Sequence, residues 1–492
     1  MSTLSSQKQC GPALDALPTE IQLLILKALV KDGYTLSHLA AVSRDWQAEI
    51  ERYNFARIKL TPSRLAGFGP MVHRNRALVQ YIWLCLELEE YDCTKCAPTG
   101  RLSEDEMVEM YAINDTTHGP ITTAFENLFA VLSTWDPNGN LTLDISVYSH
   151  SDSKHWFKYL TFMPDISSDE LGDDVIEQTT LDQVHNDPQH GWGGVSGYSA
   201  PHERALHRIF HAIMDEGPFE SEKLELKWWD QLPSVRVVTK LLLRQQNRRR
   251  WRPDALAHMF ARFPRLEEVH YEPWREWSFI KRDTDARYKY LFKSIQRSNF
   301  HLKRLVIFEN FNQHYPAFEQ RFLDGVDLTG CESIRIPDPD VSRIIAATSL
   351  RLEHLAASFI VDAIHFFEIE PLPVWSNLTS LVLTSKILAP NENPIEIESL
   401  LQTAVHATLT WRATWSFAMK STIKAWKAVM HHHYSGWTLD VIHERLSGAD
   451  INSHGDAIHH LNLSSQVVRP ISLQQIQREQ KALEGIQSVY TK

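Results

Sequence analysis

The sequence predicts an α/β protein in which a short helical unit precedes a long array of alternating strands and helices. Three observations support this fold class. A helical apolar pattern occupies the first sixty residues, short apolar runs then alternate with helical stretches, and several of these runs share the spacing L-x-x-L-x-L. A chain of 492 residues usually forms more than one structural unit.

Composition and charge are typical of a soluble globular protein, with 43% hydrophobic and 23% charged residues. The net charge of −11 argues against nucleic-acid binding as the main function, because binding to phosphate groups needs a basic surface. Five cysteines are too few for a secreted disulfide framework. The N-terminus lacks a secretory signal, and no stretch reaches the roughly 20 apolar residues that span a bilayer. We therefore expect a soluble protein of the cytoplasm or nucleus.

The first helix is predicted to begin at Leu17-Pro18. Proline at the first helical position loses no useful hydrogen-bond donor, and Glu20 suits the positive end of the helix dipole. Apolar residues then recur at helical spacing as far as Leu29, and Asp32-Gly33 is expected to end the helix.

Two further short helices are predicted before residue 60. One covers Leu36–Val42, and Ser43 caps the other, on which Trp46, Ile50 and Tyr53 recur on one side. Three short helices cannot bury all of these apolar faces against one another. Some of this apolar surface is therefore expected to bind a partner.

This combination of residues resembles the F-box family. The residues that carry the resemblance are Leu17, Pro18, Glu20, Ile21, Leu24, Ile25, Leu29, Leu36, Leu39, Val42, Ser43, Arg44 and Trp46. In that family the Leu-Pro start and the following apolar residues insert into a Skp-type adaptor, which links to a cullin and thereby to ubiquitin transfer. The resemblance implies an adaptor-binding set of Leu17, Pro18, Ile21, Leu24, Ile25, Leu29, Val42 and Trp46.

The connection Lys31–Thr35 is slightly longer than the usual F-box pattern. The alternative interpretation is that these helices only cap a larger domain, with Trp46 as an ordinary core aromatic.

Four runs in the body of the chain place two apolar anchors ahead of a short strand. They begin at Leu266, Leu302, Leu352 and Leu378. Their spacing is uneven, whereas regular leucine-rich repeats recur every 20–29 residues or so. The pattern predicts an irregular leucine-rich-repeat-like array whose runs form neighbouring parallel strands. An ordinary α/β domain with a mixed sheet is the alternative.

Weaker patterns extend the array toward the N-terminus. Strands are expected at 79–86, 141–147 and 238–243, and amphipathic helices at 204–214 and 254–263.

The chain is accordingly divided into an F-box at 12–60, a repeat-like body at 61–400 and a mainly helical capping region at 401–492. Within the body, residues 164–201 are acidic and then rich in Gly, Asn and His, without a sustained period. This composition predicts a mobile loop.

Much of the body also resembles a family of fungal F-box proteins with an uncharacterised C-terminal domain. The resemblance lies in the runs Tyr81–Leu84, Glu87-Leu88, Glu90–Cys93, Arg248–Arg250, Pro264–Glu267, Tyr271–Trp277, Trp411–Trp415 and Val468–Leu473. It implies no particular chemistry for the body.

No metal site is predicted. Cys93 and Cys96 have the C-x-x-C spacing of a zinc knuckle, but no second ligand pair follows at suitable spacing. The consecutive histidines 431–433 would point in different directions on a helix. His202 and His207 are five residues apart, which takes the second imidazole off the face of the first.

The glycine-rich run Gly191–Gly197 matches neither the dinucleotide nor the P-loop pattern, and Ser196 does not lie in G-x-S-x-G. The arginines of Arg248–Arg252 could bind nucleic acid or act as a nuclear import signal, but a structural or solvated cluster is the favoured interpretation.

The sequence therefore predicts a protein that is not an enzyme, with no catalytic residue, cofactor or metal. The expected function is substrate recruitment to a cullin-type ubiquitin ligase, with an unknown protein target bound by the body. Two alternatives remain, an F-box scaffold that acts outside ubiquitin ligation and an unrecognised enzyme with a site in the body.

Overall fold

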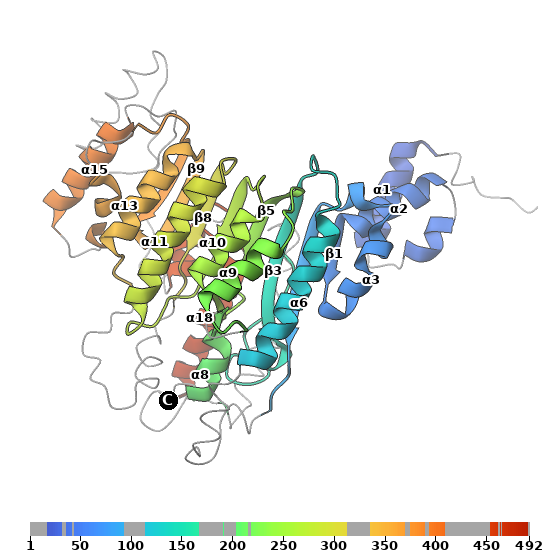
Figure 1. The fold of residues 1–492 in the computed structure, drawn as a ribbon, viewed down its shortest axis with the longest axis horizontal. Helices are drawn as coiled ribbons and strands as arrows, with labels where there is room; N and C mark the ends of the chain where they lie inside the picture. The colour runs from blue at the N-terminus through green and yellow to red at the C-terminus, as the bar shows by residue number, and fades with distance from the viewer. Residues whose placement is uncertain are drawn as a thin grey trace, which may run out of the picture.

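The computed structural model describes residues 17–31, 36–41, 44–92, 114–166, 190, 203–214, 218–311, 335–369, 374–388, 393–408, 453–460, 463 and 465–490. An eight-stranded sheet organises these residues, and its strands lie side by side in the order in which they occur in the chain (Figure 1). All seven neighbouring pairs are parallel. The protein thus has an α/β fold built on a parallel sheet.

The strands of this sheet are β1 (Arg57–Leu60), β2 (Tyr81–Leu88), β3 (Leu141–Ser149), β5 (Val238–Leu243), β7 (Glu268–Tyr271), β8 (Arg304–Phe308), β9 (His354–Asp362) and β10 (Ser380–Thr384). A separate parallel pair joins β4 (Ala212–Ile213) to β6 (Arg250–Trp251). Helix α8 (Glu203–Phe210) is shorter than the predicted 204–214, because Ala212 and Ile213 pair with β6 instead of continuing the helix.

One face of the sheet is apolar and carries the helices. The register places a row of aliphatic side chains across the strands, consisting of Ile58, Ile82, Leu143, Leu241, Val269, Leu305, Leu355 and Leu381. Residues of this row share the main hydrophobic core with the covering helices. These helices are α3 (Pro62–Val72), α6 (Asn114–Leu132), α9 (Glu222–Gln231), α10 (Pro253–Ala261), α11 (Lys281–Ser298), α13 (Pro339–Thr348), α14 (Ala363–Phe367) and α15 (Pro394–Thr408).

The four runs that the sequence singled out form β7, β8, β9 and β10, which are neighbours in that order. Their first anchors, Leu266, Leu302, Leu352 and Leu378, each lie two residues ahead of the strand and are almost fully buried. The prediction of neighbouring parallel strands is confirmed for these runs. Crossovers through helices allow this order, since parallel neighbours need a long connection.

The opposite face of the sheet carries segments from the C-terminus. Helices α17 (His454–His460) and α18 (Pro470–Tyr490) approach this face over the central strands, and Ile458, Val468 and Ile476 form a second core with Phe308 of β8. In Figure 1 the red end of the chain lies behind the sheet, whereas the helices of the main core lie in front of it. The described residues of the predicted capping region therefore cover a face of the sheet as well as one of its ends, where α15 lies.

The N-terminal unit consists of α1 (Thr19–Lys31), a 3-10 helix η2 (Leu36–Ala41) and α2 (Arg44–Ala56). Its small core contains Leu26, Trp46 and Ile50 and is separate from the core of the sheet. Helix α2 continues directly into β1, so residues 57–60, which the sequence analysis placed in the N-terminal unit, belong to the sheet. Among the described helices none is long and apolar enough to cross a membrane.

Candidate functional site

The first helix presents apolar side chains to solvent. Leu24 is 60% exposed and Ile21 is 42% exposed, and Pro18 just ahead of the helix is also exposed. Large aliphatic residues on a surface indicate a docking site when they gather on one element, since such exposure is unfavourable in water. Pro18, Ile21 and Leu24 are referred to below as the α1 patch.

The other residues of the predicted adaptor-binding set are less accessible. Leu17, Ile25 and Leu29 are half-buried, and Ile25 and Leu29 pack against the small N-terminal core. Val42 lies outside the described residues. Trp46 is buried, and its indole N–H donates a hydrogen bond to Gln22 Oε1 at 3.0 Å. The structure thus places Trp46 in the core, which matches the alternative interpretation of this residue.

Gln22 is a residue that sequence reasoning missed. Its amide also donates a hydrogen bond to the carbonyl oxygen of Leu17 at 2.9 Å, so it ties the start of α1 to Trp46 on α2. Tyr53, which was expected to share a face with Trp46 and Ile50, is exposed on α2. No pattern in the sequence distinguished Gln22 from a solvent-facing glutamine.

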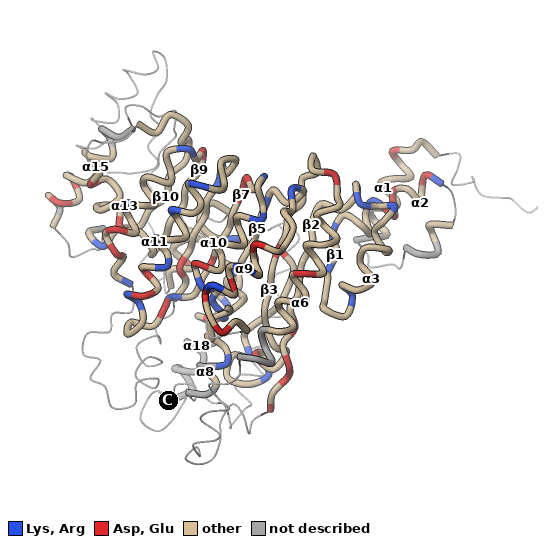
Figure 2. Tube along the Cα trace, in the orientation of Figure 1, with Lys and Arg blue, Asp and Glu red and all other residues tan. Residues whose placement is uncertain are grey.

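The arginine cluster Arg244–Arg252 is structural. Each of its arginines is buried, and each pairs with a carboxylate from another segment. The pairs are Arg244–Asp144, Arg248–Glu479, Arg249–Asp152, Arg250–Glu276 and Arg252–Glu225. Elsewhere, cationic and anionic residues are interspersed along the described chain (Figure 2). These arginines are therefore not available to bind phosphate groups, since each is buried and neutralised.

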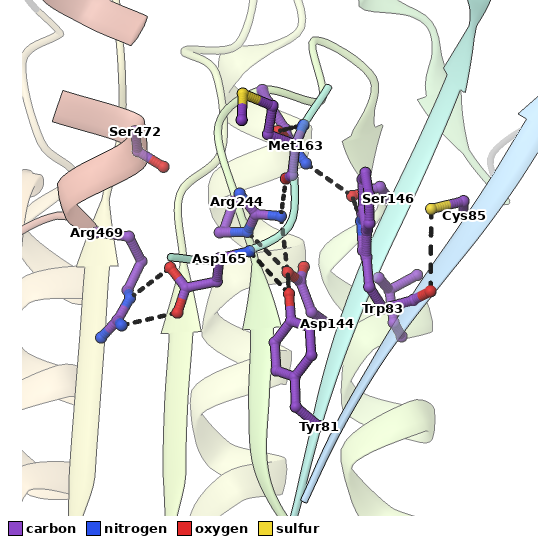
Figure 3. Close-up of polar contacts among 12 residues, drawn as sticks. Tyr81, Trp83, Cys85, Asp144, Ser146, Met163, Asp165, Arg244, Arg469 and Ser472 are labelled. Carbon is purple, nitrogen blue, oxygen red and sulfur yellow. Dashed lines mark hydrogen bonds and ion pairs between the residues drawn. The ribbon is translucent and has the colours of Figure 1, made fainter. Parts of the chain in front are cut away.

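A buried polar cluster surrounds Arg244 on the face opposite the helices (Figure 3). The Tyr81 hydroxyl donates to Asp144 Oδ2 at 2.5 Å, and Arg244 Nε donates to the same oxygen at 2.9 Å. Burial raises the pKa of the Asp144 carboxyl, although the Arg244 guanidinium opposes this shift. Arg244 Nη2 also donates to the Met163 carbonyl at 2.7 Å. The cluster thus joins β2, β3 and the segment after β5.

The C-terminal segment completes this cluster. Arg469 donates to both carboxylate oxygens of Asp165, at 3.1 and 2.7 Å, and the Ser472 hydroxyl donates to Glu272 Oε2 at 2.5 Å. Parallel sheets commonly bind ligands just beyond the carboxyl ends of their strands. Here residues 472–479 form hydrogen bonds with Gln245 and Arg248, which follow β5, and with Glu272, which follows β7. The carboxylates in this region form hydrogen bonds and ion pairs with other residues of the chain. This arrangement indicates that the cluster stabilises the fold.

Glu309 lies at the end of β8 and is fully buried, which raises the pKa of its carboxyl to about 8. Arg335 Nη1 donates to Glu309 Oε1 at 2.5 Å. Within the part of the chain that the structure describes, no group of three or more potential ligands could hold a metal ion. The motifs at Cys93, Cys96, 191–197 and 431–433 all lie outside that part.

His454 fixes α17 to the sheet face through aromatic stacking and a hydrogen bond. Its ring lies 4.6 Å from that of Phe311 between centroids, with an interplanar angle of 22°, and its Nε2 is 3.0 Å from Asn310 Oδ1. The amide of Asn310 donates to Gln245 at 2.6 Å, so Asn310 Oδ1 accepts and His454 Nε2 donates. Burial lowers the pKa of His454 to about 4, although the nearby Asp456 carboxylate opposes this shift.

We expect the free energy of unfolding to fall as the pH is lowered from 7 to 5, because His454 is held neutral in the folded state. The folded state holds His454 neutral, whereas the unfolded chain binds a proton near pH 6.5, so stability present above pH 6.5 is lost as the pH falls toward 4. The contribution is about 2 kcal/mol over this interval. Urea denaturation at both pH values should show that His454→Phe removes this part of the pH dependence. His459→Phe, at an exposed position of the same helix, is the control and should leave it in place.

A family model matches residues 298–409 and 404–469 of the chain, and its description is "Family of unknown function (DUF6546)". The matched stretch begins at the last residue of α11 and stops just before α18, and it covers less than half of the chain. No curated protein matches the chain. The similarity therefore extends from the second half of the sheet into the C-terminal segment, and it leaves the N-terminal helices unmatched.

Proposed function

We propose that this chain is an F-box protein that recruits a substrate protein to a cullin-type ubiquitin ligase. The observation that carries the proposal is the α1 patch. Pro18, Ile21 and Leu24 belong to the residues that resemble the F-box, and all three are exposed although they are apolar. A Skp-type adaptor that covers them would remove this unfavourable surface from water.

We infer that the body of the chain binds the target protein through strand ends and loops, because both faces of the sheet are covered over its central strands. Parallel strands in sequence order with helices on one face are the arrangement expected of an irregular leucine-rich-repeat-like array. In this proposal the chain, of the fungal F-box type and located in the cytoplasm or nucleus, carries out no chemistry itself. It acts by proximity, because it raises the effective concentration of a target lysine near the enzyme that carries the ubiquitin.

Leu24→Glu should weaken binding of the purified chain to a Skp-type adaptor. An apolar anchor at an interface commonly contributes about 2 kcal/mol or more, so affinity should fall about thirtyfold or more. Calorimetry or biolayer interferometry with the full chain measures this change. The position is largely exposed, so the fold should tolerate the substitution.

Ile395→Glu is the matched control. Ile395 is 74% exposed on α15, which lies at the end of the sheet opposite α1 (Figure 1). Replacing this exposed aliphatic residue with Glu should leave adaptor binding unchanged. Equal adaptor affinity of the wild type and Leu24→Glu would contradict the proposed docking site. Adaptor binding without recovery of a cullin would instead favour the scaffold function.

A further inference from the structure

The two edges of the eight-stranded sheet differ in charge. Edge strand β1 is only four residues long and carries the exposed cations Arg57 and Lys59. It is also bounded directly by α2 and α3. Short length and charge are features that prevent an edge strand from pairing with another chain.

Edge strand β10 is one residue longer than β1, but it carries no charge. No charged residue occurs from Val374 to Ser385, and each residue of β10 is half-buried. Leu381 belongs to the aliphatic row that crosses the sheet, and its neighbours in that row, Leu305 and Leu355, are buried. Leu381 itself is only half-buried. A further strand beside β10 would complete this burial.

We propose that β10 pairs with β10 of a second copy of this chain, so that two sheets join into one across a two-fold axis. The sequence of the edge is nearly symmetric about Val382, since Leu381 and Leu383 flank it and Ser380 and Thr384 follow on either side. Antiparallel pairing centred on Val382 puts Leu381 of each copy opposite Leu383 of the other. Such matched pairs stabilise neighbouring strands, and a two-fold axis makes the same patch serve both copies.

The backbone of β10 fits this register. The amide of Ser380 donates to Glu353 O, and Ser380 and Val382 pair with His354 and Ala356 of β9. Backbone polar groups alternate in direction along a strand, so those of Leu381 and Leu383 point away from β9. In the proposed register, Leu381 and Leu383 exchange N–H···O bonds between the two copies. Val382 of one copy lies opposite Val382 of the other as a non-hydrogen-bonded pair.

Helix α15 would add to the interface. It lies at the β10 end of the molecule (Figure 2). Its Ile395 is largely exposed, whereas its Leu400 belongs to the main core. A pair of five-residue strands alone buries less than the roughly 1,200 Å² of a stable interface. We therefore expect a dimer that forms in the micromolar range and that uses α15 as well as β10.

Sedimentation equilibrium of the full chain from about 1 to about 200 µM tests the proposal, because association is concentration-dependent. The wild type should shift from monomer to dimer over this range. Ser380→Lys places a cation on the edge of both copies and should keep the chain monomeric, with an unchanged circular dichroism spectrum. Ser380→Thr keeps the edge uncharged and should dimerise like the wild type.

Cross-linking tests the register independently. Val382→Cys brings the two new sulfurs within reach, because non-hydrogen-bonded antiparallel pairs have Cα atoms about 4.5 Å apart and disulfides span 4.4–6.8 Å or so. Ser380→Cys puts the two new sulfurs on residues whose Cα atoms lie about 13 Å apart along the strands and should not cross-link. Non-reducing electrophoresis beside the wild type separates these results.

A wild-type chain that stays monomeric at the highest concentration would overturn the proposal. So would equal dimerisation of Ser380→Lys, or cross-linking of Ser380→Cys in preference to Val382→Cys. A monomer whose β10 amides become protected from hydrogen exchange only when an extended peptide is added would assign the edge to a foreign strand. Dimerisation does not depend on the adaptor, so the outcome is independent of the proposed F-box function.

Discussion

Glu479→Ala should lower the free energy of unfolding by about 3–5 kcal/mol, because it leaves a buried charge without its partner. Glu479 on α18 bonds to Arg248 at 2.5 Å, and both side chains are almost fully buried. Arg248 also stacks on Trp274, with its guanidinium carbon 3.6 Å from the ring centroid. The Tyr159 hydroxyl, which donates to Glu479 Oε1 at 3.3 Å, loses an acceptor in the same variant.

Urea denaturation of a double-mutant cycle measures this pair. The single variants Arg248→Met and Glu479→Leu should each lower the free energy of unfolding. Their combination should recover much of the loss, since an apolar pair needs no counter-charge. Arg343→Ala, which removes an exposed ion pair with Glu368 at 3.2 Å, is the control and should change stability little. Additive effects of the two single variants would show that Arg248 and Glu479 do not interact in solution.

Leu378→Ala should lower the free energy of unfolding by about 2–5 kcal/mol through the cavity that it leaves. Leu378 is the anchor ahead of the edge strand β10 and is 1% exposed within the main core. Leu352→Ala, at the equivalent position ahead of β9, should have a similar effect.

Ser380→Ala is the matched control within the same strand. Ser380 is half-buried on the opposite face of the sheet, so its replacement should be nearly neutral. Denaturation curves of the three variants under one condition provide the comparison. A loss below about 1 kcal/mol for both leucine variants would mean that these anchors do not fill a tightly packed core.

The strands were predictable from the sequence because their signal is local. The patterns at 141–147 and 238–243 lie within β3 and β5, and the four anchored runs form β7 to β10. Each run contains its own apolar anchors and strand-forming residues, so its identity does not depend on distant parts of the chain. The first helix begins at Thr19, one residue after the predicted start at Pro18, and α1 ends at Lys31, just before Asp32-Gly33.

The role of single residues was less predictable, because it depends on partners far away in the chain. Trp46 could bind an adaptor or fill a core, and only its contact with Gln22 and Ile50 places it in the core. The run Arg248–Arg252 resembles a basic patch when it is read alone. Its carboxylate partners lie up to 231 residues away, as with Glu479, and no local pattern connects them.

By itself, the sequence determined the α/β class, the helical N-terminal unit and the positions of most strands, since these follow from periodicity and from residues that start or end helices. Only the tertiary structure decided that the C-terminal segment packs on the sheet face opposite the helices of the main core. It also decided that Arg469 forms a half-buried ion pair there and Glu479 a buried one. It also decided which apolar residues of α1 remain exposed. The physical reason is that burial and charge pairing depend on contacts between distant segments, which a pattern along the chain does not contain.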